Sequence, residues 1–268
     1  SAFQGSFNEA IMMRIASGTP PDAILHYSSP VAYAARGTCA QLDDLLNAGD
    51  AMTRDDIVTA AWGAVTWQGK TWGVPINGSE CSMWYNVEKM QEAGLATERA
   101  KLPKTLEEVR AMSAKVTQYE GDTLVSCGEW PWAQGVWALH GMAVSNGGGL
   151  WDGEKYTINN PKNAELIKFW IDWLDEMYKG DLDKLNAQGT LGNAYPGGLF
   201  ANKVQVMTSQ GNWALTHYPP EIKIEIDVMP IGPSGTKSAT SNWPNLMFIP
   251  TGAKHIKEGF KLIAYYAT

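Results

Sequence analysis

The architecture of this chain can be worked out from Trp67–Asn86, which reads WQGKTWGVPINGSECSMWYN. Two apolar runs, Thr71–Ile76 and Ser82–Tyr85, are rich in Trp, Val, Ile and Tyr and are predicted to be strands. The polar segment Asn77–Glu80 lies between them and has too few turn residues to require a tight hairpin. A strand that leaves one layer through a few polar residues and enters another is typical of a crossing between two α/β lobes. An ordinary surface loop between adjacent strands explains these residues equally well.

Length and composition narrow the class of protein. The 268 residues, 44% hydrophobic and 18% charged, suit a soluble globular chain with two domains or one large domain. A net charge of -7 and a pI near 5.1 argue against a nucleic-acid or anionic-membrane partner, because no stripe of Lys and Arg is present. No run approaches the roughly 18 apolar residues of a membrane span. The opening residues do not resemble a signal peptide, so the chain is expected to be either cytosolic or already processed.

The cysteines and aromatic residues carry different information. Cys39, Cys81 and Cys127 are widely separated and form no CxxC pair, so neither a zinc site nor a disulfide framework is predicted, and each is expected to be a small buried hydrophobe. The chain has 12 Trp and 10 Tyr beside only 6 Phe. Trp and Tyr combine an apolar face with a polar tip, so this excess suits a surface that binds an amphipathic, ring-shaped ligand.

Helices and strands alternate along the chain. Apolar spacing and capping residues predict helices at Phe7–Ala16, Val31–Arg36, Leu42–Leu46, Asp55–Ala64, Glu88–Ala93, after the capping box Thr105–Glu108, at Val136–Val144, after Asn160 and at Ile256–Tyr266. Further strands are predicted at Asp22–Tyr27, Thr123–Cys127, Val204–Thr208, Ile222–Met229 and Leu246–Ile249. In parallel α/β sheets ligands meet the loop that follows a strand. The glycine-rich loop Asn146–Trp151 lacks the spacing of a phosphate-binding loop and is interpreted as a turn.

Several short motifs occur in a specific order across nearly the whole chain: Gly18-Thr19-Pro20-Pro21-Asp22, Gly69-Lys70 through Val74-Pro75 to Tyr85-Asn86, Glu92–Leu95, Pro103-Lys104-Thr105, and Phe200-x-Asn202-Lys203 with Met207 and Gly211-x-Trp213. Together they resemble the extracellular solute-binding proteins of sugar ABC importers, family 1, the group that includes maltose-binding protein. The match is specific to the family and does not select a particular sugar.

The resemblance implies an α/β fold of the type II periplasmic-binding-protein class, with two lobes hinged around a ligand cleft. The N-terminal lobe would comprise residues 1–78 and 230–268, and the C-terminal lobe residues 79–229. Family members begin with an additional strand–helix–strand and continue with further helices, so the chain is expected to be truncated at both ends, with an incomplete N-terminal lobe. The implied function is to bind a mono- or oligosaccharide in the cleft and to deliver it to the membrane permease subunits of an ABC importer. No cofactor, metal or nucleic acid is expected, and the implied protein is a periplasmic or extracellular monomer, with lipid anchoring left open.

The resemblance also places the ligand contacts. They fall on the loop after the first strand, on the crossing, on the segment after the Thr123–Cys127 strand, and near two later loops: His26, Tyr27, Ser28, Ser29, Asn77, Ser79, Glu80, Glu129, Trp130, Trp132, Asn212, Trp213, Asn242 and Trp243. The Gly-x-Trp context of Trp213 resembles the place where these proteins stack an indole on a pyranose ring. Glu80 and Glu129 could hydrogen-bond to sugar hydroxyls, and solvated or salt-bridged carboxylates are the alternative. The loop His26–Ser29 lacks the Trp and Asp/Arg pair of maltose-binding protein, so maltodextrin is not expected.

Two other functions compete with sugar binding. A glycoside hydrolase would also line a cleft with Trp and two carboxylates, for which Glu80 and Glu129 are available. The four His are scattered and HExxH, GxSxG and nucleotide-loop motifs are missing from the sequence, so a binding protein rather than an enzyme is expected. A binder of glycerol phosphate or another small polar solute would need Arg or Lys at the site, and the loops named above supply none.

Overall fold

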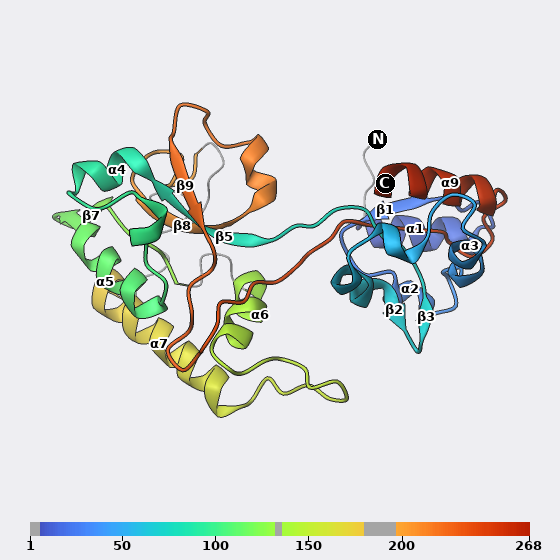
Figure 1. The fold of residues 1–268 in the computed structure, drawn as a ribbon, viewed down its shortest axis with the longest axis horizontal. Coiled ribbons are helices and arrows are strands. Elements are labelled where there is room, and N and C mark those ends of the chain that lie inside the picture. The colour runs from blue at the N-terminus through green and yellow to red at the C-terminus, as the bar shows by residue number, and fades with distance from the viewer. Residues whose placement is uncertain (1–5, 132–135, 180–196) are drawn as a thin grey trace. The chain divides into compact units, whose positions relative to one another are not determined.

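In the computed structural model, residues 6–131, 136–179 and 197–268 are described. The chain forms two compact units, drawn in Figure 1: unit 1 contains residues 1–79 and 242–268, and unit 2 contains residues 80–241. The first boundary falls within the predicted crossing, between Ser79 and Glu80. Within the described ranges, every helix is too short or too polar to cross a membrane.

The second boundary differs from the sequence-based expectation. It lies between Ser241 and Asn242, whereas the sequence suggested residues 229–230. The intervening residues belong to unit 2, because Ser145 Oγ donates to the carbonyl of Pro230 at 3.0 Å and Thr240 Oγ1 donates to the carbonyl of Cys81 at 2.8 Å. The sequence changes character both near residue 230 and near residue 241. The two tertiary hydrogen bonds identify the second position as the point where the chain leaves unit 2.

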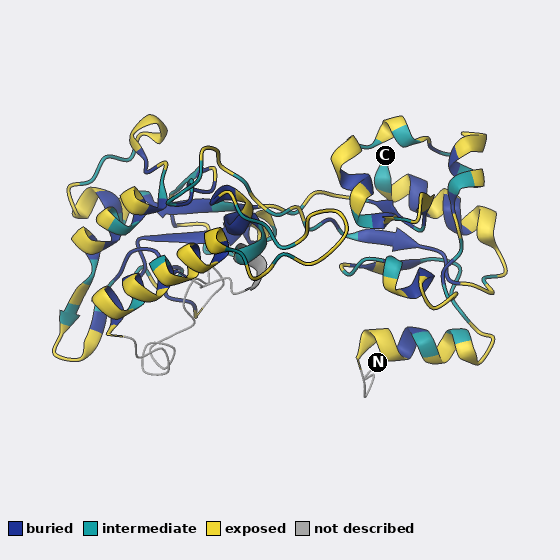
Figure 2. Ribbon diagram, turned by 90° about the horizontal axis from the view of Figure 1, so that it is seen from below, coloured by how far each residue is buried: buried dark blue, intermediate teal, exposed yellow. Residues whose placement is uncertain are grey.

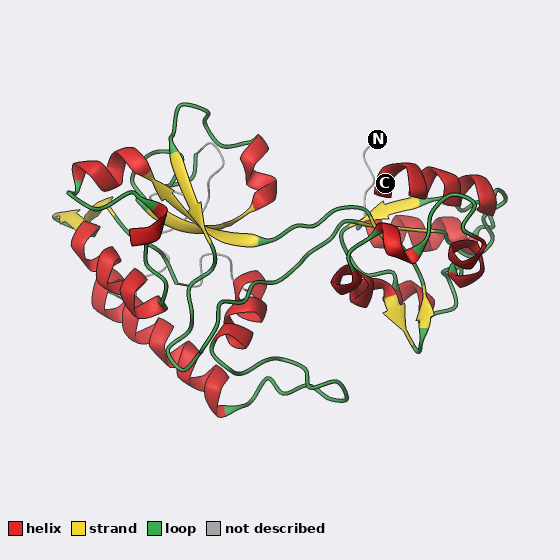
Figure 3. Cartoon of the chain, viewed as in Figure 1, coloured by secondary structure: helices red, strands yellow, loops and turns green. Residues whose placement is uncertain are grey.

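Unit 1 is built on the antiparallel sheet β1–β10–β4, with β1 at Ile24–His26, β10 at Leu246–Phe248 and β4 at Val74–Pro75. The register places His26 and Pro75 opposite Leu246, so β1 and β4 end at the edge where β10 begins. Helices α1 Phe7–Ala16, α2 Val31–Ala34, α3 Asp43–Ala48 and α9 Ile256–Ala267 and the hairpin of β2 Thr66–Trp67 and β3 Lys70–Thr71 complete the unit (Figure 3).

The helical segment predicted at Asp55–Ala64 is divided in two and is not an α-helix. The structure has two 3-10 helices there, η1 Arg54–Asp56 and η2 Thr59–Val65. Trp62 connects the two pieces, because its indole Nε1 donates to the Arg54 carbonyl at 3.1 Å and the Arg54 guanidinium lies 5.2 Å from the ring centre. Trp62 is buried in the core of unit 1.

Unit 2 is built on the antiparallel sheet β8–β5–β9, with β5 at Cys81–Asn86 in the middle, β8 at Met207–Gly211 and β9 at Ile224–Asp227. Around it lie α4 Val87–Glu92, α5 Leu106–Val116, α6 Val136–Ser145, α7 Pro161–Tyr178, the hairpin β6 Gln118–Glu120 and β7 Thr123–Ser126, and the 3-10 helices η3 Arg99–Lys101 and η4 Asn212–Thr216. Alternate β5 residues enter different cores: Met83 and Tyr85 join one cluster and Trp84 joins another. Both faces of β5 are therefore covered, which explains its continuous apolar sequence.

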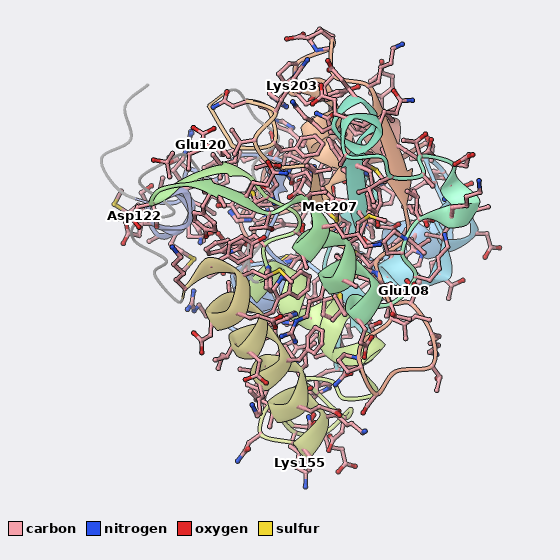
Figure 4. All side chains as sticks on the ribbon, turned by 90° about the vertical axis from the view of Figure 1, so that its left-hand side faces the viewer. Glu108, Glu120, Asp122, Lys155, Lys203 and Met207 are labelled. Carbon is pink, nitrogen blue, oxygen red and sulfur yellow. The ribbon has the colours of Figure 1, made fainter. Side chains whose placement is uncertain are left out.

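Local sequence signals place several helices of unit 2 correctly. The Thr105 hydroxyl accepts from the Glu108 amide and the Glu108 carboxylate accepts from the Thr105 amide, each at 3.2 Å, so the predicted capping box starts α5. Figure 2 shows buried strands behind helices whose outer faces are exposed. Figure 4 shows Met207 among the inner side chains, and its sulfur lies 3.9 Å from Ser113 Oγ of α5.

Candidate ligand-binding site

The sheet of unit 2 gathers three of the predicted residues at one edge. Cys81 lies opposite Gly211 and Met83 lies opposite Asp227, so β5 begins where β8 and β9 end. Glu80, just before β5, and Asn212, just after β8, are hydrogen-bonded through two contacts: the Glu80 amide donates to Asn212 Oδ1 at 3.3 Å, and the Asn212 amide donates to the Glu80 carbonyl at 3.0 Å. Both residues are exposed, and Trp213 follows directly.

Trp213 is half-buried at the start of η4. Its indole lies against the backbone of Gly211, where a Cβ atom would come within 2.1 Å of the ring. Only glycine therefore fits at this position. The ring also packs on buried residues of both unit 2 cores. An indole that is fixed in this way and remains partly exposed loses little freedom when it stacks on a ligand.

A hollow of about 330 Å³ lies beside this edge, entirely within unit 2. Glu80 and Asn212 line it, together with residues that the sequence did not single out: Arg99, Val228 and Thr240. Arg99 Nε donates to Asp227 Oδ1 at 3.3 Å. The loops that the sequence mapped to the site supply no Arg or Lys, and the hollow gains Arg99 from a short 3-10 helix outside those loops and outside the recognised motifs.

Asp227 holds two cations at the wall of this hollow. Its side chain is 5% exposed and pairs with Arg99 and with the Lys104 ammonium group. Burial raises the pKa of the Asp227 carboxyl, but hydrogen bonds from Lys104, the Val228 backbone and Arg99 outweigh it, so the pKa lies below its ordinary value. Asp227 is consequently an anion that fixes η3 and Lys104 against the end of β9.

Glu129 and Trp130 lie inside unit 2 rather than on its surface, each 5% exposed. The Glu129 carboxyl oxygens accept hydrogen bonds from the Ser209 amide at 2.9 Å and from Ser209 Oγ at 2.7 Å. The Trp130 ring packs on Tyr178, with ring centres 4.8 Å apart. Trp132 falls outside the described residues. Glu129 and Trp130 therefore do not lie at the sheet edge that holds Glu80.

The loop after β1 is held by contacts among its own residues and by contacts to α1 and η2. His26 is buried, its ring stacks on Phe7 and Tyr27 at centre distances of 5.1 and 4.8 Å, and burial lowers its pKa. The Ser28 amide donates to His26 Nδ1 at 2.7 Å, and Ser29 Oγ donates to the Ala64 carbonyl at 2.7 Å. Tyr27, 69% exposed, presents the open aromatic surface of this loop.

The remaining predicted residues lie on the two segments that join the units. Trp243 donates its backbone amide to the Ser79 carbonyl at 2.7 Å, and Asn77 Oδ1 accepts from the Asn245 amide at 2.8 Å. Asn77 and Asn242 line a hollow of about 220 Å³ within unit 1. Because β4 ends and β10 begins at the edge where β1 ends, Asn77 and Tyr27 belong to the same edge of this sheet.

The chemistry of the described residues limits other readings of the site. No group of His, Cys, Asp and Glu in the described ranges is arranged to hold a metal ion. Glu129, one of the two carboxylates considered for glycoside hydrolysis, has both oxygens engaged by Ser209 in a buried position.

Comparisons with known proteins agree with this architecture. A family model of bacterial extracellular solute-binding proteins matches residues 3–268, and the chain therefore belongs to this family. No curated protein sequence matches it.

Solved structures give the fold. CpMnBP1 with mannobiose bound is 25% identical with a TM-score of 0.81, over 99% of this chain and 67% of that one. An ABC substrate-binding protein from Listeria monocytogenes in complex with cycloalternan is 21% identical with a TM-score of 0.77, over 98% and 66%. Maltose-bound MalE3 of T. maritima is 18% identical with a TM-score of 0.69, over 96% and 65%. The predicted family and type II periplasmic-binding-protein fold are confirmed, and the chain spans about two thirds of the length of these structures.

Proposed function

We propose that this chain is the sugar-binding component of an ABC importer. The observation that carries the proposal is Trp213, a half-buried indole fixed on Gly211 beside Glu80 and Asn212. Membership of an extracellular solute-binding family supports it. The ligands bound in similar structures, which include mannobiose, cycloalternan and α-D-tagatose, support it as well. The partners would be a sugar and the permease subunits of the importer, and the chain would bind both of them outside the cytoplasm.

The geometry supplies both kinds of contact that a sugar needs. The indole of Trp213 offers an apolar surface to the axial C–H groups of a pyranose. The Glu80 carboxylate accepts from hydroxyls, and the Asn212 amide can both accept and donate. The adjoining hollow of about 330 Å³ has the volume of a small-molecule site. Three further points are predictions. Unit 1 would contribute Tyr27, Asn77 and Asn242, both lobes would enclose the ligand, and the protein would be a monomer.

A small anionic solute such as glycerol phosphate is a second candidate. Arg99 favours it, because this guanidinium lines the hollow while its Nε is engaged by Asp227. A guanidinium presents several donors in one plane and binds phosphate through two of them. Arg99→Gln would then weaken phosphate binding strongly and would change the binding of a neutral sugar much less.

Thermal shift with mannobiose, mannotriose, tagatose and glycerol 3-phosphate tests both candidates, because a ligand that binds the folded state stabilises it by RT ln(1 + [L]/Kd). We expect one of the sugars to raise the melting temperature. Trp213→Ala should make that rise much smaller, and the control Trp151→Ala, at an exposed indole outside the site, should leave it unchanged. A rise only with glycerol 3-phosphate would favour the second candidate. Release of monosaccharide from mannobiose would show a hydrolase instead.

A further inference from the structure

Glu129 is held from separate elements of unit 2. Its amide donates to Ser113 Oγ of α5 at 3.0 Å, and its carbonyl accepts from the Tyr178 hydroxyl of α7 at 2.9 Å. Its carboxyl is bound by Ser209 of β8 through the amide and the hydroxyl. The preceding residue, Gly128, packs so closely on α5 that a Cβ atom would lie 2.3 Å from Ser113 Oγ. The backbone of Glu129 therefore has little room to shift.

The same contacts lead from Glu129 to the proposed sugar contact. Ser209 and Gly211 are two residues apart on β8, so their positions face the same side of the sheet. The indole of Trp213 rests on Gly211. A displacement of β8 at Ser209 would therefore move the surface on which this indole lies.

We propose that Glu129 is a positioning residue for Trp213: its carboxyl fixes β8 through Ser209, and it acts on the ligand through that strand without touching it. This inference rests on the proposed function in one respect, the role of Trp213 as a sugar contact. It differs from the assignment of Glu129 as a ligand contact that the family resemblance implied. The distinction is chemical, because a ligand contact needs an open carboxylate, whereas a positioning residue needs only its two bonds to Ser209.

The surroundings of Glu129 favour its neutral form. Tyr85, Cys127 and Tyr178 interact electrostatically with Glu129, and none of these three side chains can carry a positive charge. Burial raises the pKa of the Glu129 carboxyl to about 8, against the hydrogen bonds from Ser209 and the Trp130 amide, which lower it. A neutral carboxyl has one donating and one accepting oxygen. An ionised carboxylate accepts from both Ser209 groups. When the carboxyl is neutral, its protonated oxygen can instead donate to the Ser209 hydroxyl while the other oxygen still accepts from the Ser209 amide, and glutamine reproduces this second pattern.

Hydrogen exchange without any ligand tests the positioning role directly. Glu129→Ala should speed exchange of the amides at 207–211 roughly tenfold, because buried polar groups lose their partner. Glu129→Gln should leave these amides protected. Between about pH 5 and 8, where the carboxyl is protonated in the native state and ionised once the strand opens, protection of this segment, after correction for intrinsic exchange, should fall in the wild type and stay constant in Glu129→Gln. If Glu129→Ala folds and leaves 207–211 protected, or if both proteins respond to pH alike, Glu129 does not fix this strand.

Mannobiose titration separates this inference from the proposed function. We expect Glu129→Gln to keep the wild-type Kd within about twofold and Ser209→Ala to raise it several-fold, since coupled residues act together. A large loss of affinity in Glu129→Gln, with 207–211 still protected, would make Glu129 a ligand contact and would overturn the inference. If the wild type fails to bind mannobiose, the choice of this sugar is contradicted, while the exchange measurements still decide whether Glu129 holds β8. If Glu129→Ala does not fold, the pH dependence of exchange at 207–211 in the wild type and in Glu129→Gln shows whether Glu129 holds β8.

Discussion

The backbone amide of Trp243 donates a hydrogen bond of 2.7 Å to the carbonyl of Ser79, so the two segments that join the units lie side by side. Asn245 adds two bonds: its amide donates to Asn77 Oδ1 at 2.8 Å, and its carbonyl accepts from the Ile76 amide at 2.9 Å. One joining segment therefore cannot change its backbone conformation without breaking these bonds or moving the other segment. The Asn77 side chain helps to hold the two joining segments together, so this residue has a structural role in addition to any contact with a ligand.

Trp213→Ala should weaken sugar binding by roughly 2 kcal/mol or more, about thirtyfold in Kd, because it removes a large stacking surface. Trp213→Phe should recover part of the affinity, since an aromatic face remains. Isothermal titration with the sugar found by thermal shift measures this. Trp62→Ala is the matched control and should lower the melting temperature with little effect on Kd, because Trp62 is buried in the core of unit 1. Normal binding by a destabilised Trp213→Ala would make this indole part of the core only.

Gly211→Ala should weaken sugar binding although it removes none of the side chains proposed to contact the sugar. The new methyl group would lie 2.1 Å from the Trp213 ring, so the indole must leave its position. Gly78→Ala is a suitable control, because its Cβ would meet only Asn242 Nδ2, at 3.8 Å. Titration of both variants, with near-ultraviolet circular dichroism to follow the indole, compares them. Equal affinities would show that binding does not depend on where this ring lies.

Asp227→Asn should lower the free energy of unfolding by about 2 kcal/mol, because it breaks pairs to a buried carboxylate. The pKa of Asp227 is lowered in the folded state, so its contribution is present above the unfolded pKa of about 3.9 and is lost as pH falls through the folded pKa. Urea unfolding at several pH values should thus show the full difference near pH 7 and a progressively smaller one as pH falls below about 4. Glu98→Gln, which breaks an exposed pair with Lys101, should change nothing measurable.

Native protein should contain three unreactive thiols. Cys39, Cys81 and Cys127 are free and buried, and burial raises the pKa of Cys39 to about 12 and that of Cys81 to about 11. A thiol reagent at pH 8 should therefore modify them only after unfolding, because the thiolate is the reactive form. Mass spectrometry of unreduced protein checks the count. A disulfide between Cys81 and Cys127 would contradict the described arrangement.

Local signals in the sequence were sufficient for much of the fold. The capping box at Thr105, the Asn160 cap of α7 and the helix Phe7–Ala16 lie where they were predicted, because residues a few positions apart determine them. The predicted strand Val204–Thr208 is observed as Met207–Gly211 instead. Its polar end, Ser209 and Gln210, is buried by pairing with β5, which no local pattern reveals.

The candidate site was harder to predict, because burial of a polar residue depends on distant partners. Glu80, Asn212 and Trp213 were found from motifs, and the register of β5 and β8 brings them together. Glu129 gave the same sequence signal as Glu80, yet Ser209 holds it in the interior. Arg99 reaches the hollow through its pair with Asp227, far away in the sequence, and no spacing rule connects the two.

The order of the strands in unit 1 has a consequence for synthesis. β10 lies between β1 and β4 and pairs with both, yet it comes from the last stretch of the chain, after all of unit 2. During synthesis, β1 and β4 cannot form their native pairing until β10, Leu246–Phe248, has left the ribosome. Unit 2, by contrast, is one continuous stretch, and its sheet can close earlier. The middle of this polypeptide can therefore reach its native structure before its beginning does.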